Sequence, residues 1–203
     1  MIENEKTANM NCHFRHMPQH SVLLTQRGLT LLEMLVAVAV LAIILTSVAP
    51  GIQSILIKNR ITSDLNSLSA VVQHARFTAV NEQTTVLMCP TANYTSCVAN
   101  WGNAKMVFID DNGNGNRDDD EALIITSDPL NAANTIYGVA GTLTFGEQGS
   151  ISQSATITIC PKDNDATYAS ALLLSLYGRI SVAIDSDGNG KKEDLSGAEL
   201  SCS

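Results

Sequence analysis

The stretch "QRGLTLLEMLVAVAVLAIILTSVAP", residues 26–50, decides the architecture of this 203-residue chain. From Leu29 to Ala49 it runs for twenty-one residues with Glu33 as its only charged side chain. A helix of that length crosses the roughly 30 Å hydrocarbon core of a bilayer. A carboxylate in such a segment costs free energy unless it has a partner. The stretch therefore predicts a single membrane span, residues 29–50, whose glutamate serves a purpose other than anchoring.

The charges and cysteines on either side of the span indicate its orientation. Lys6, Arg15 and Arg27 precede it, and the first basic residues after it are Lys58 and Arg60. The positive-inside rule then places the N-terminus in the cytoplasm and the C-terminal part outside it. The cysteines agree, because one of the five precedes the span and the other four form an even set suited to an oxidising compartment.

A secretory signal peptide is one alternative interpretation of this N-terminus, since Ser47-Val48-Ala49 loosely fits a small-x-small cleavage site. The apolar run, however, exceeds the usual length of about 7–15 residues, and Pro50 would directly follow the cut. A plain membrane anchor explains the length of the run but leaves Gly28 and Glu33 unexplained. We therefore favour a third interpretation.

The segment "RGLTLLEMLVAVAVLAIILTSVAP" resembles the prepilin signature of type IV pilins and type II secretion pseudopilins. The resemblance implies that a prepilin peptidase cleaves between Gly28 and Leu29 and N-methylates Leu29, so that residues 1–28 are a leader. A start at Met17 would give a shorter leader. Glu33 would become the fifth mature residue and, by the same resemblance, pair with the N-terminal amine of a neighbouring subunit during filament assembly.

A second apolar pattern continues the helix through residues 51–82. Apolar side chains recur there at spacings of four and three, as on one face of an amphipathic helix: Ile61, Leu65, Leu68, Val72, Ala75 and Ala79. We expect this half of the helix to pack on a sheet. Pro50, where the resembling family often bends its helix, would mark the boundary between the two halves.

Residues 83–203 have a different sequence pattern, which predicts a β-rich exported domain. Short segments rich in β-branched residues alternate there with clusters of Gly, Asn, Asp and Ser. The segments are "TTVLMC", "KMVFI", "ALIIT", "TLTF", "ATITIC", "ALLLSLY" and "RISVAI". One long helix followed by an antiparallel β-sheet domain is an α+β arrangement, here the type IV pilin fold.

The order of landmarks after the span resembles the GspH/FimT group of minor pilins and pseudopilins. The landmarks are "LSAVVQHARFTAVNEQTTVLMCP", a second cysteine, Trp101, "MVFIDDNGNGNRDDDE", a late cysteine and "LYGRISVAI". The resemblance implies a membrane-stored subunit of a type II secretion pseudopilus or a type IV pilus, with other major and minor pilins or pseudopilins as partners. The subunit would span the bacterial inner membrane once, with its C-terminal domain in the periplasm, before it enters a filament.

Four cysteines follow the span and permit three disulfide pairings. We favour Cys89–Cys97, which closes a short loop after the first predicted strand. The remaining pair, Cys160–Cys202, would tie the C-terminal segment back to a strand. Because the second pair encloses the longer loop, it should stabilise more, on the order of 3–4 kcal/mol.

The stretch from Asp110 to Glu121 fits the D-x-[DN]-x-[DN]-G-x5-E pattern of a calcium loop. Its candidate ligands are Asp110, Asn112, Asn114, Asn116, Asp118 and Glu121. The strand-like flanks argue against an EF-hand, and a solvated Asn/Gly/Asp hairpin loop fits the same residues. We favour the solvated loop, expect no required cofactor, and expect calcium to bind no tighter than about 10⁻⁴–10⁻³ M. A second loop, residues 185–190, begins the same pattern but has Ser196 at the twelfth position, which makes it the weaker candidate.

DNA uptake is an alternative function. The resemblance implies a Gly-Arg-x-Arg motif in a DNA-binding branch of the group, whereas this chain reads Gly178-Arg179-Ile180-Ser181. Three of the twelve basic and two of the twenty acidic residues lie in the leader, so residues 29–203 carry nine basic and eighteen acidic residues. Phosphate binding requires clustered positive charge. We therefore expect no nucleic-acid partner, and keep Arg179 only as the candidate DNA contact.

An enzyme is not expected either. His74 is the only histidine after the leader, and neither a nucleophile motif nor a Gly-rich phosphate loop accompanies it. The sequence thus predicts a minor pilin or pseudopilin, with a DNA-binding pilin and a calcium-dependent adhesive module as the alternatives.

Overall fold

The computed structural model describes residues 28–203, so the predicted leader lies outside the described residues except for Gly28. The chain divides into two compact units, residues 1–45 and 46–203. The helix α1 (Leu31–Glu82) contributes to both units. Its residues 31–47 are exposed, and it contains a stretch long and apolar enough to cross a membrane. The helix continues through position 50, whose side chain is outside the described part of the chain, so the bend at Pro50 stays a prediction.

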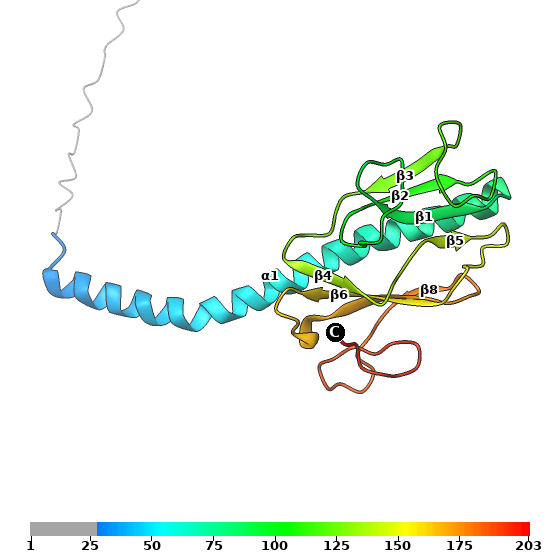
Figure 1. Cartoon of the computed structure of the whole chain (residues 1–203). Coiled ribbons are helices and arrows are strands. Elements are labelled where there is room, and N and C mark those ends of the chain that lie inside the picture. The colour runs from blue at the N-terminus through cyan, green and yellow to red at the C-terminus, as the bar shows by residue number, and fades with distance from the viewer. Residues whose placement is uncertain (1–27) are drawn as a thin grey trace, which may run out of the picture. The chain divides into compact units, whose positions relative to one another are not determined.

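The part of α1 in the second unit buries the stripe that the sequence indicates. None of the six stripe residues is more than 4 % exposed: Ile61, Leu65, Leu68, Val72, Ala75 and Ala79. They join one apolar core with residues of both sheets described below (Figure 1). Trp101 is 3 % exposed at the edge of this core, and its indole N–H donates to the Gly141 carbonyl oxygen at 3.1 Å. It is the packing residue that its place before a strand suggests.

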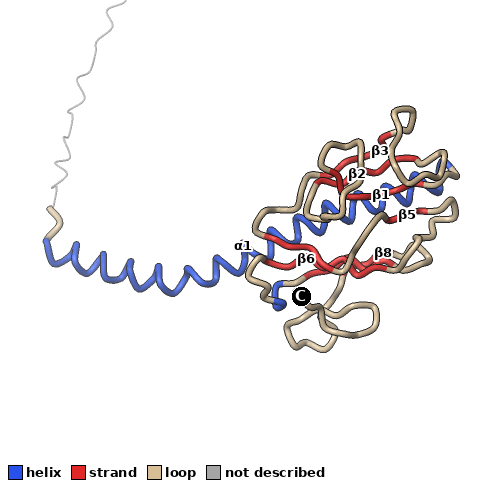
Figure 2. The backbone as a smooth tube through the Cα atoms, in the orientation of Figure 1, coloured by secondary structure: helices blue, strands red, loops and turns tan. Residues whose placement is uncertain are grey.

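The predicted antiparallel β domain contains two four-stranded sheets (Figures 1 and 2). Sheet A has the order β3-β2-β1-β5, and its strands are β1 (Val86–Thr91), β2 (Ala104–Ile109), β3 (Leu123–Ser127) and β5 (Leu143–Phe145). Sheet B has the order β4-β6-β7-β8, and its strands are β4 (Asn134–Tyr137), β6 (Ala155–Pro161), β7 (Ser170–Leu174) and β8 (Ile180–Val182). A short 3₁₀ helix, Ala166–Tyr168, connects β6 and β7. The sequence predicted the antiparallel β domain but not its division into two sheets, because hydrophobic periodicity identifies strands and not the neighbours with which they pair.

The strand β4 was not predicted. It is four residues long and, after the buried Asn134, its side chains are half-buried. It lies at the edge of sheet B, where it pairs only with β6. Such a short, partly exposed edge strand carries little of the alternation by which strands are recognised.

The central strands β1, β2, β6 and β7 are buried along nearly their whole length, whereas β3 and β8 at the sheet edges are half-buried or exposed. In β1, Val86 and Met88 contact the core around α1, while Leu87 and Cys89 face the opposite side with Phe108. In β7, alternate residues divide in the same way between the main core and a second cluster near the C-terminus. The outer face of each sheet is therefore covered by chain over its central strands.

A disulfide holds each of these covering segments. Cys89–Cys97 joins β1 to the segment over sheet A, with a Cα–Cα distance of 5.6 Å and a sequence separation of 8. Cys160–Cys202 joins β6 to the C-terminal segment over sheet B, with corresponding values of 5.9 Å and 42. Both are the pairs that the sequence favoured. Leu200 and Cys202 pack with Cys160 in the outer cluster of sheet B, so the second disulfide fastens a covering layer.

Candidate functional site

The predicted cleavage bond lies immediately before α1. Gly28, Leu29 and Thr30 are exposed and have no regular secondary structure. An open, non-helical segment is the conformation in which a protease can reach a peptide bond. A Cβ built on Gly28 would meet no atom within 4 Å. The fold of the described chain thus tolerates a side chain at position 28, so a requirement for glycine would have to come from the peptidase.

Thr30 caps the helix that follows. Its Oγ1 accepts the backbone N–H of Glu33 at 3.2 Å, and its carbonyl oxygen accepts the N–H of Met34 at 3.2 Å. Thr-x-x-Glu is the sequence pattern of a capping box. A carboxylate in the first turn is also favoured by the partial positive charge at the N-terminal end of a helix. The capping signal is local, so Thr30 and Glu33 could have been assigned this role from the sequence.

Glu33 is surrounded by exposed apolar side chains. Leu31, Leu32 and Met34 have 79 %, 71 % and 54 % of their surface exposed. Among residues 28–203, the single ion pair is Lys191–Glu199, so Glu33 has no cationic partner in the part of the chain that the structure describes. An unpaired carboxylate in an apolar surface is stabilised when another molecule supplies a cationic partner.

Two family models match the chain. Residues 23–49 match a prokaryotic N-terminal methylation motif, and residues 64–178, more than half of the chain, match the type II transport protein GspH. The chain belongs to the GspH family. It is a minor pilin or pseudopilin, as the sequence predicted, and its methylation motif implies processing by a prepilin peptidase.

The fold of this GspH family member is that of a type IV minor pilin. The crystal structure of the minor pilin FimU of Pseudomonas aeruginosa has a TM-score of 0.52 and 22 % identity, over 71 % of this chain and 96 % of FimU. A second crystal form of FimU gives a TM-score of 0.49, over 70 % of this chain and 99 % of FimU. Among curated proteins, no sequence is significantly similar to this chain. The long helix packed on antiparallel sheets confirms the predicted pilin fold.

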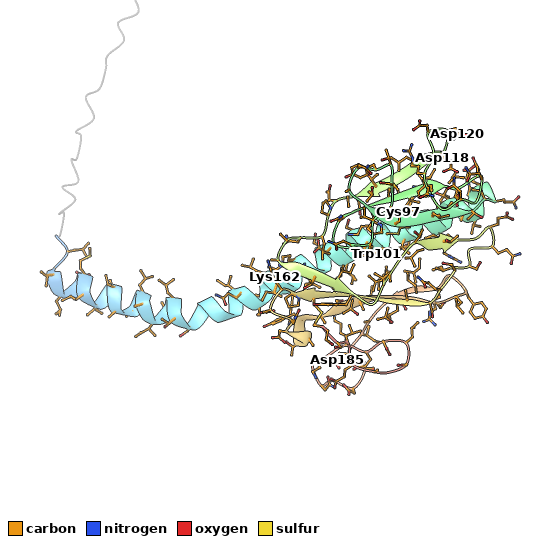
Figure 3. The ribbon with its side chains drawn as sticks, in the orientation of Figure 1. Cys97, Trp101, Asp118, Asp120, Lys162 and Asp185 are labelled. Atoms are coloured by element: carbon orange, nitrogen blue, oxygen red, sulfur yellow. A yellow bond between two sulfur atoms is a disulfide. The ribbon has the colours of Figure 1, made fainter. Side chains whose placement is uncertain are left out.

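The predicted calcium residues gather in one loop between β2 and β3, the first acidic loop (residues 110–121; Figure 3). Asp110 is 7 % exposed, and its carboxylate accepts the N–H groups of Asn114 and Gly115, both at 3.1 Å. Glu121 is 3 % exposed and uses both oxygens, accepting the N–H of Asp111 at 3.0 Å and that of Asp118 at 3.0 Å. The two buried carboxylates therefore close the loop on its own backbone.

The exposed residues of the first acidic loop also pair with one another. Asp118 Oδ2 accepts the side-chain amides of Asn112 at 2.7 Å and Asn114 at 2.8 Å. Asn114 Oδ1 in turn accepts the N–H of Asn116 at 2.7 Å. Every candidate ligand is thus in place in this loop, and most of its acceptor oxygens are engaged within it. This arrangement fits a self-contained hairpin loop.

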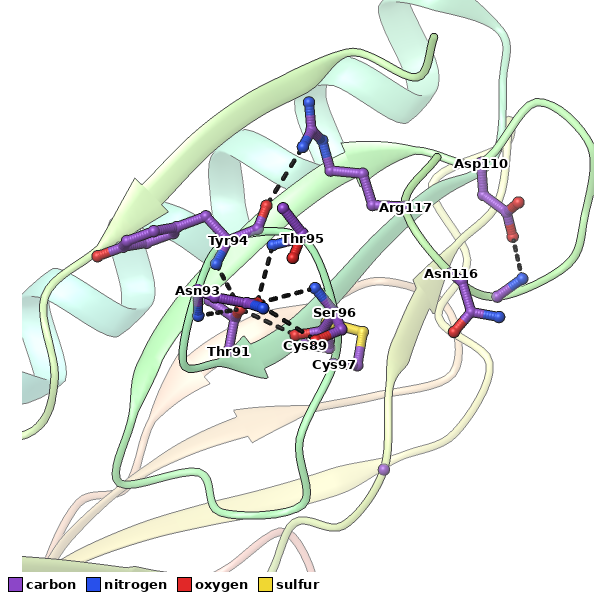
Figure 4. The surroundings of a disulfide bond; sticks show 12 residues. Cys89, Thr91, Asn93, Tyr94, Thr95, Ser96, Cys97, Asp110, Asn116 and Arg117 are labelled. Atoms are coloured by element: carbon purple, nitrogen blue, oxygen red, sulfur yellow. Dashed lines mark hydrogen bonds between the residues drawn. A yellow bond between two sulfur atoms is a disulfide. The ribbon is translucent and has the colours of Figure 1, made fainter. Parts of the chain in front are cut away.

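The first acidic loop also contacts the segment closed by Cys89–Cys97. Arg117 Nη1 donates to the Tyr94 carbonyl oxygen at 3.3 Å (Figure 4). Thr91 Oγ1 accepts the N–H of Tyr94 at 2.8 Å and so shapes the same segment. The contact joins the loop to the layer that covers sheet A.

Arg179 does not form part of a basic surface. It is exposed in the turn that leads into β8, where its N–H donates to Ser175 Oγ at 3.1 Å. The surface hollow that it lines also contains Glu193 and Asp194. Phosphate binding requires clustered positive charge, and these neighbours are acidic. The structure thus places the candidate DNA contact in unfavourable surroundings for DNA.

The glycine before Arg179 has a structural role instead. Gly178 has a φ of 76°, and a Cβ built on it would collide with the Gly149 carbonyl oxygen. Arg76 Nε donates to that same carbonyl oxygen at 3.0 Å. The landmark "LYGRISVAI" therefore marks a close contact between two turns and α1, which the sequence alone did not indicate.

Polar residues also line a cavity of about 150 Å³ between α1 and the sheets. Asp64 Oδ2 accepts the Asn134 side-chain amide at 2.6 Å, and Arg60 Nε donates to Asn134 Oδ1 at 2.8 Å. Burial lowers the pKa of Lys105 in the same cavity, while the charge of Asp64 acts in the opposite direction. These contacts join the helix to β4, and none of them brings a nucleophile next to a base.

Proposed function

We propose that the chain is a membrane-stored subunit that is cut between Gly28 and Leu29, methylated on Leu29, and inserted into a type II secretion pseudopilus or a type IV pilus. The position of Glu33 carries this proposal. Its carboxylate is exposed in the first turn of an apolar helix, four residues after the new amine. In lipid, an unpaired carboxylate and an unpaired amine are both costly, and their pairing between subunits removes both costs. Glu33 would then set the register of an entering subunit.

The proposed location follows from the same features. The span would cross the bacterial inner membrane with residues 1–28 in the cytoplasm and residues 51–203 in the periplasm. The two disulfides support an oxidising compartment for the β domain. The expected partners are the prepilin peptidase and other major and minor pilins or pseudopilins. Such a subunit needs neither catalysis nor a cofactor for assembly.

The test of the register role compares Glu33→Ala and Glu33→Gln with Leu35→Ala, a matched change at a 61 % exposed apolar position of the same helix. Intact-mass analysis of the membrane fraction reports cleavage, and quantitation in sheared filaments reports incorporation. We expect all three variants to be cleaved and retained in the membrane, and only the two Glu33 variants to be depleted from filaments. Incorporation of Glu33→Ala at the level of the unaltered protein would defeat the proposal.

The cleavage step has its own test. Gly28→Ala should accumulate the uncut precursor, because the peptidase is expected to require glycine there. Gly51→Ala is the matched control, since a Cβ at either glycine would meet no atom within 4 Å. Normal maturation of Gly28→Ala would place the cleavage site elsewhere.

A further inference from the structure

The second acidic loop (residues 185–193) follows β8 and is held at both ends. The N–H of Glu193 donates to the Ile184 carbonyl oxygen at 3.0 Å, which closes the loop at its base. On the upstream side, the N–H of Ala183 donates to the carbonyl oxygen of Ala171 in β7 at 2.9 Å. Downstream, the chain continues to Cys202, which is bonded to β6. The loop is therefore a surface feature on a fixed frame.

Three carboxylates converge in this loop. One oxygen each from Asp185, Asp187 and Glu193 lies within 4.8 Å of the others. Asp185 and Asp187 are exposed, whereas Glu193 is 8 % exposed. Like charges at such distances repel one another, so the arrangement favours a cation between them.

The buried Glu193 lacks a partner on one side. Its Oε2 accepts the backbone N–H and the hydroxyl of Ser186, both at 2.8 Å. Its Oε1 is buried and has no hydrogen-bond partner. A buried carboxylate oxygen without a donor costs free energy, more than a neutral acceptor would. The missing donor is an observation separate from the spacing of the three carboxylates, and it indicates the same kind of ligand.

The neighbouring lysines are directed elsewhere. Lys191 Nζ contacts Glu199 Oε2 at 2.5 Å, and Lys192 Nζ donates to Ser170 Oγ at 2.9 Å. Among residues 28–203 the only ion pair is that between Lys191 and Glu199. No cationic side chain of the described chain therefore neutralises Glu193.

We propose that Asp185, Asp187 and Glu193 bind a divalent cation of the calcium class. These carboxylates occupy the first, third and ninth positions of the calcium-loop pattern, and the Asn189 amide oxygen and the Lys191 carbonyl oxygen occupy the fifth and seventh. Gly190, at the sixth, has the φ of 91° that the sharp turn needs. Hard oxygen ligands suit calcium rather than zinc, and calcium accepts irregular coordination more readily than magnesium, which demands near-ideal octahedral geometry.

The cation would complete the loop and stabilise the layer that covers sheet B. It would bridge the exposed side chains of Asp185 and Asp187 to the buried end of Glu193. Loops of this kind in extracellular modules bind calcium at about 10⁻⁴–10⁻³ M. The site would therefore be occupied once the β domain is exported. In this respect the proposal rests on the proposed location.

The test is isothermal titration of the full chain, freed of metal and held in detergent micelles, with CaCl₂ and separately with MgCl₂. We expect one calcium site, and Glu193→Gln and Asp187→Asn should each weaken it by about tenfold or more, because calcium affinity follows ligand charge. Glu193→Gln keeps the shape of the side chain, and Asp187 is exposed, so neither change removes a packing contact. Asp118→Asn, in the first acidic loop, is the matched control and should leave calcium binding unchanged.

Three results would overturn the proposal. The first is undiminished calcium binding in Glu193→Gln, and the second is loss of binding in Asp118→Asn. The third is the absence of saturable heat up to about 10 mM calcium, tenfold above the weakest expected constant. Each is distinct from a failure of filament assembly in the Glu33 variants, because calcium titration requires no filament.

Discussion

The first acidic loop and the second acidic loop begin with the same local structure. Asp110 accepts the N–H of Gly115 at 3.1 Å, and Asp185 accepts that of Gly190 at 2.9 Å. Both glycines have positive φ, 77° and 91°. The loops then close differently. Glu121, at the twelfth position, uses both carboxylate oxygens on backbone N–H groups, while Glu193, at the ninth, leaves one buried oxygen without a donor.

The difference shows that a complete ligand pattern in the sequence and an unsatisfied carboxylate oxygen in the structure are separate properties. The first acidic loop has the full calcium pattern, yet its buried acids already accept hydrogen bonds from the loop itself. The second acidic loop lacks an acid at the twelfth position, yet its ninth residue has a buried oxygen without a donor and lies beside two exposed carboxylates. A linear pattern counts ligand types, whereas binding depends on the lone pairs that folding leaves free.

The largest expected effect is the loss of stability when the disulfide that encloses or borders each loop is removed. Cys160–Cys202, with a separation of 42 residues, encloses the second acidic loop, and Cys89–Cys97, with a separation of 8, closes the segment that the first one contacts. Chain entropy assigns them about 4 and about 2.6 kcal/mol of stability. Urea unfolding of the full chain in micelles should show Cys160→Ser/Cys202→Ser to be the less stable double variant. The reverse order would mean that strain or packing outweighs loop length.

The next effect is stabilisation by calcium, which should arise from the second acidic loop alone. At 100 times the dissociation constant, binding to the native state adds about 2.7 kcal/mol. That corresponds to a rise in melting temperature of about 5–10 °C for a unit of this size. Melting curves with chelator and with calcium should show the full rise in the unaltered chain and in Asp118→Asn, but about half of it or less in Asp187→Asn, because tenfold weaker binding leaves about 1.4 kcal/mol of stabilisation. If the calcium-dependent rise in melting temperature disappears in Asp118→Asn, calcium binds to the first acidic loop and not to the second.

A smaller effect separates the two buried glutamates when calcium is absent. Glu121→Gln replaces one acceptor oxygen by an amide where two backbone N–H groups donate, so we expect a loss of about 1.5–3 kcal/mol. Glu193→Gln removes a charge that lacks a donor on one side, so its stability in chelator should be unchanged or higher. Urea unfolding with chelator measures both. A larger loss for Glu193→Gln than for Glu121→Gln would contradict the comparison.

The smallest effect is the pH dependence of the ion pair beside the second acidic loop. The hydrogen bond from Lys191, then its charge, lowers the pKa of Glu199, and the same contacts raise the pKa of Lys191. The contribution of Glu199 is therefore fully present above its unfolded pKa and is lost as pH falls through the lower folded value. That of Lys191 is present below its unfolded pKa and is lost as pH rises through the higher folded value. The melting difference between the unaltered chain and Lys191→Met should thus be small near pH 7 and should vanish in acid.

Part of the candidate site could be predicted from sequence because it is local. Gly28 and Glu33 were identified by the spacing of a short motif, and the acidic loop by the ligand types between Asp110 and Glu121. The disulfide pairs were favoured because Cys89 and Cys97 lie close in the sequence and close a short loop, which leaves Cys160 for Cys202. Glu193 was missed because the pattern examined for its loop ends at Ser196, and nothing local shows that Glu193 is buried.

The sequence by itself determined the apolar helix long enough to span a membrane, the signature at its start, the buried stripe of α1 and most of the short strands. Each depends on side chains within a few turns of one another, and hydrophobic length or periodicity expresses them directly. Only the tertiary structure decided that the strands form two sheets, that β4 completes the second, and which carboxylate oxygens remain free. Those features depend on partners distant in the chain, because strand pairing and the satisfaction of buried polar groups are settled by non-local contacts.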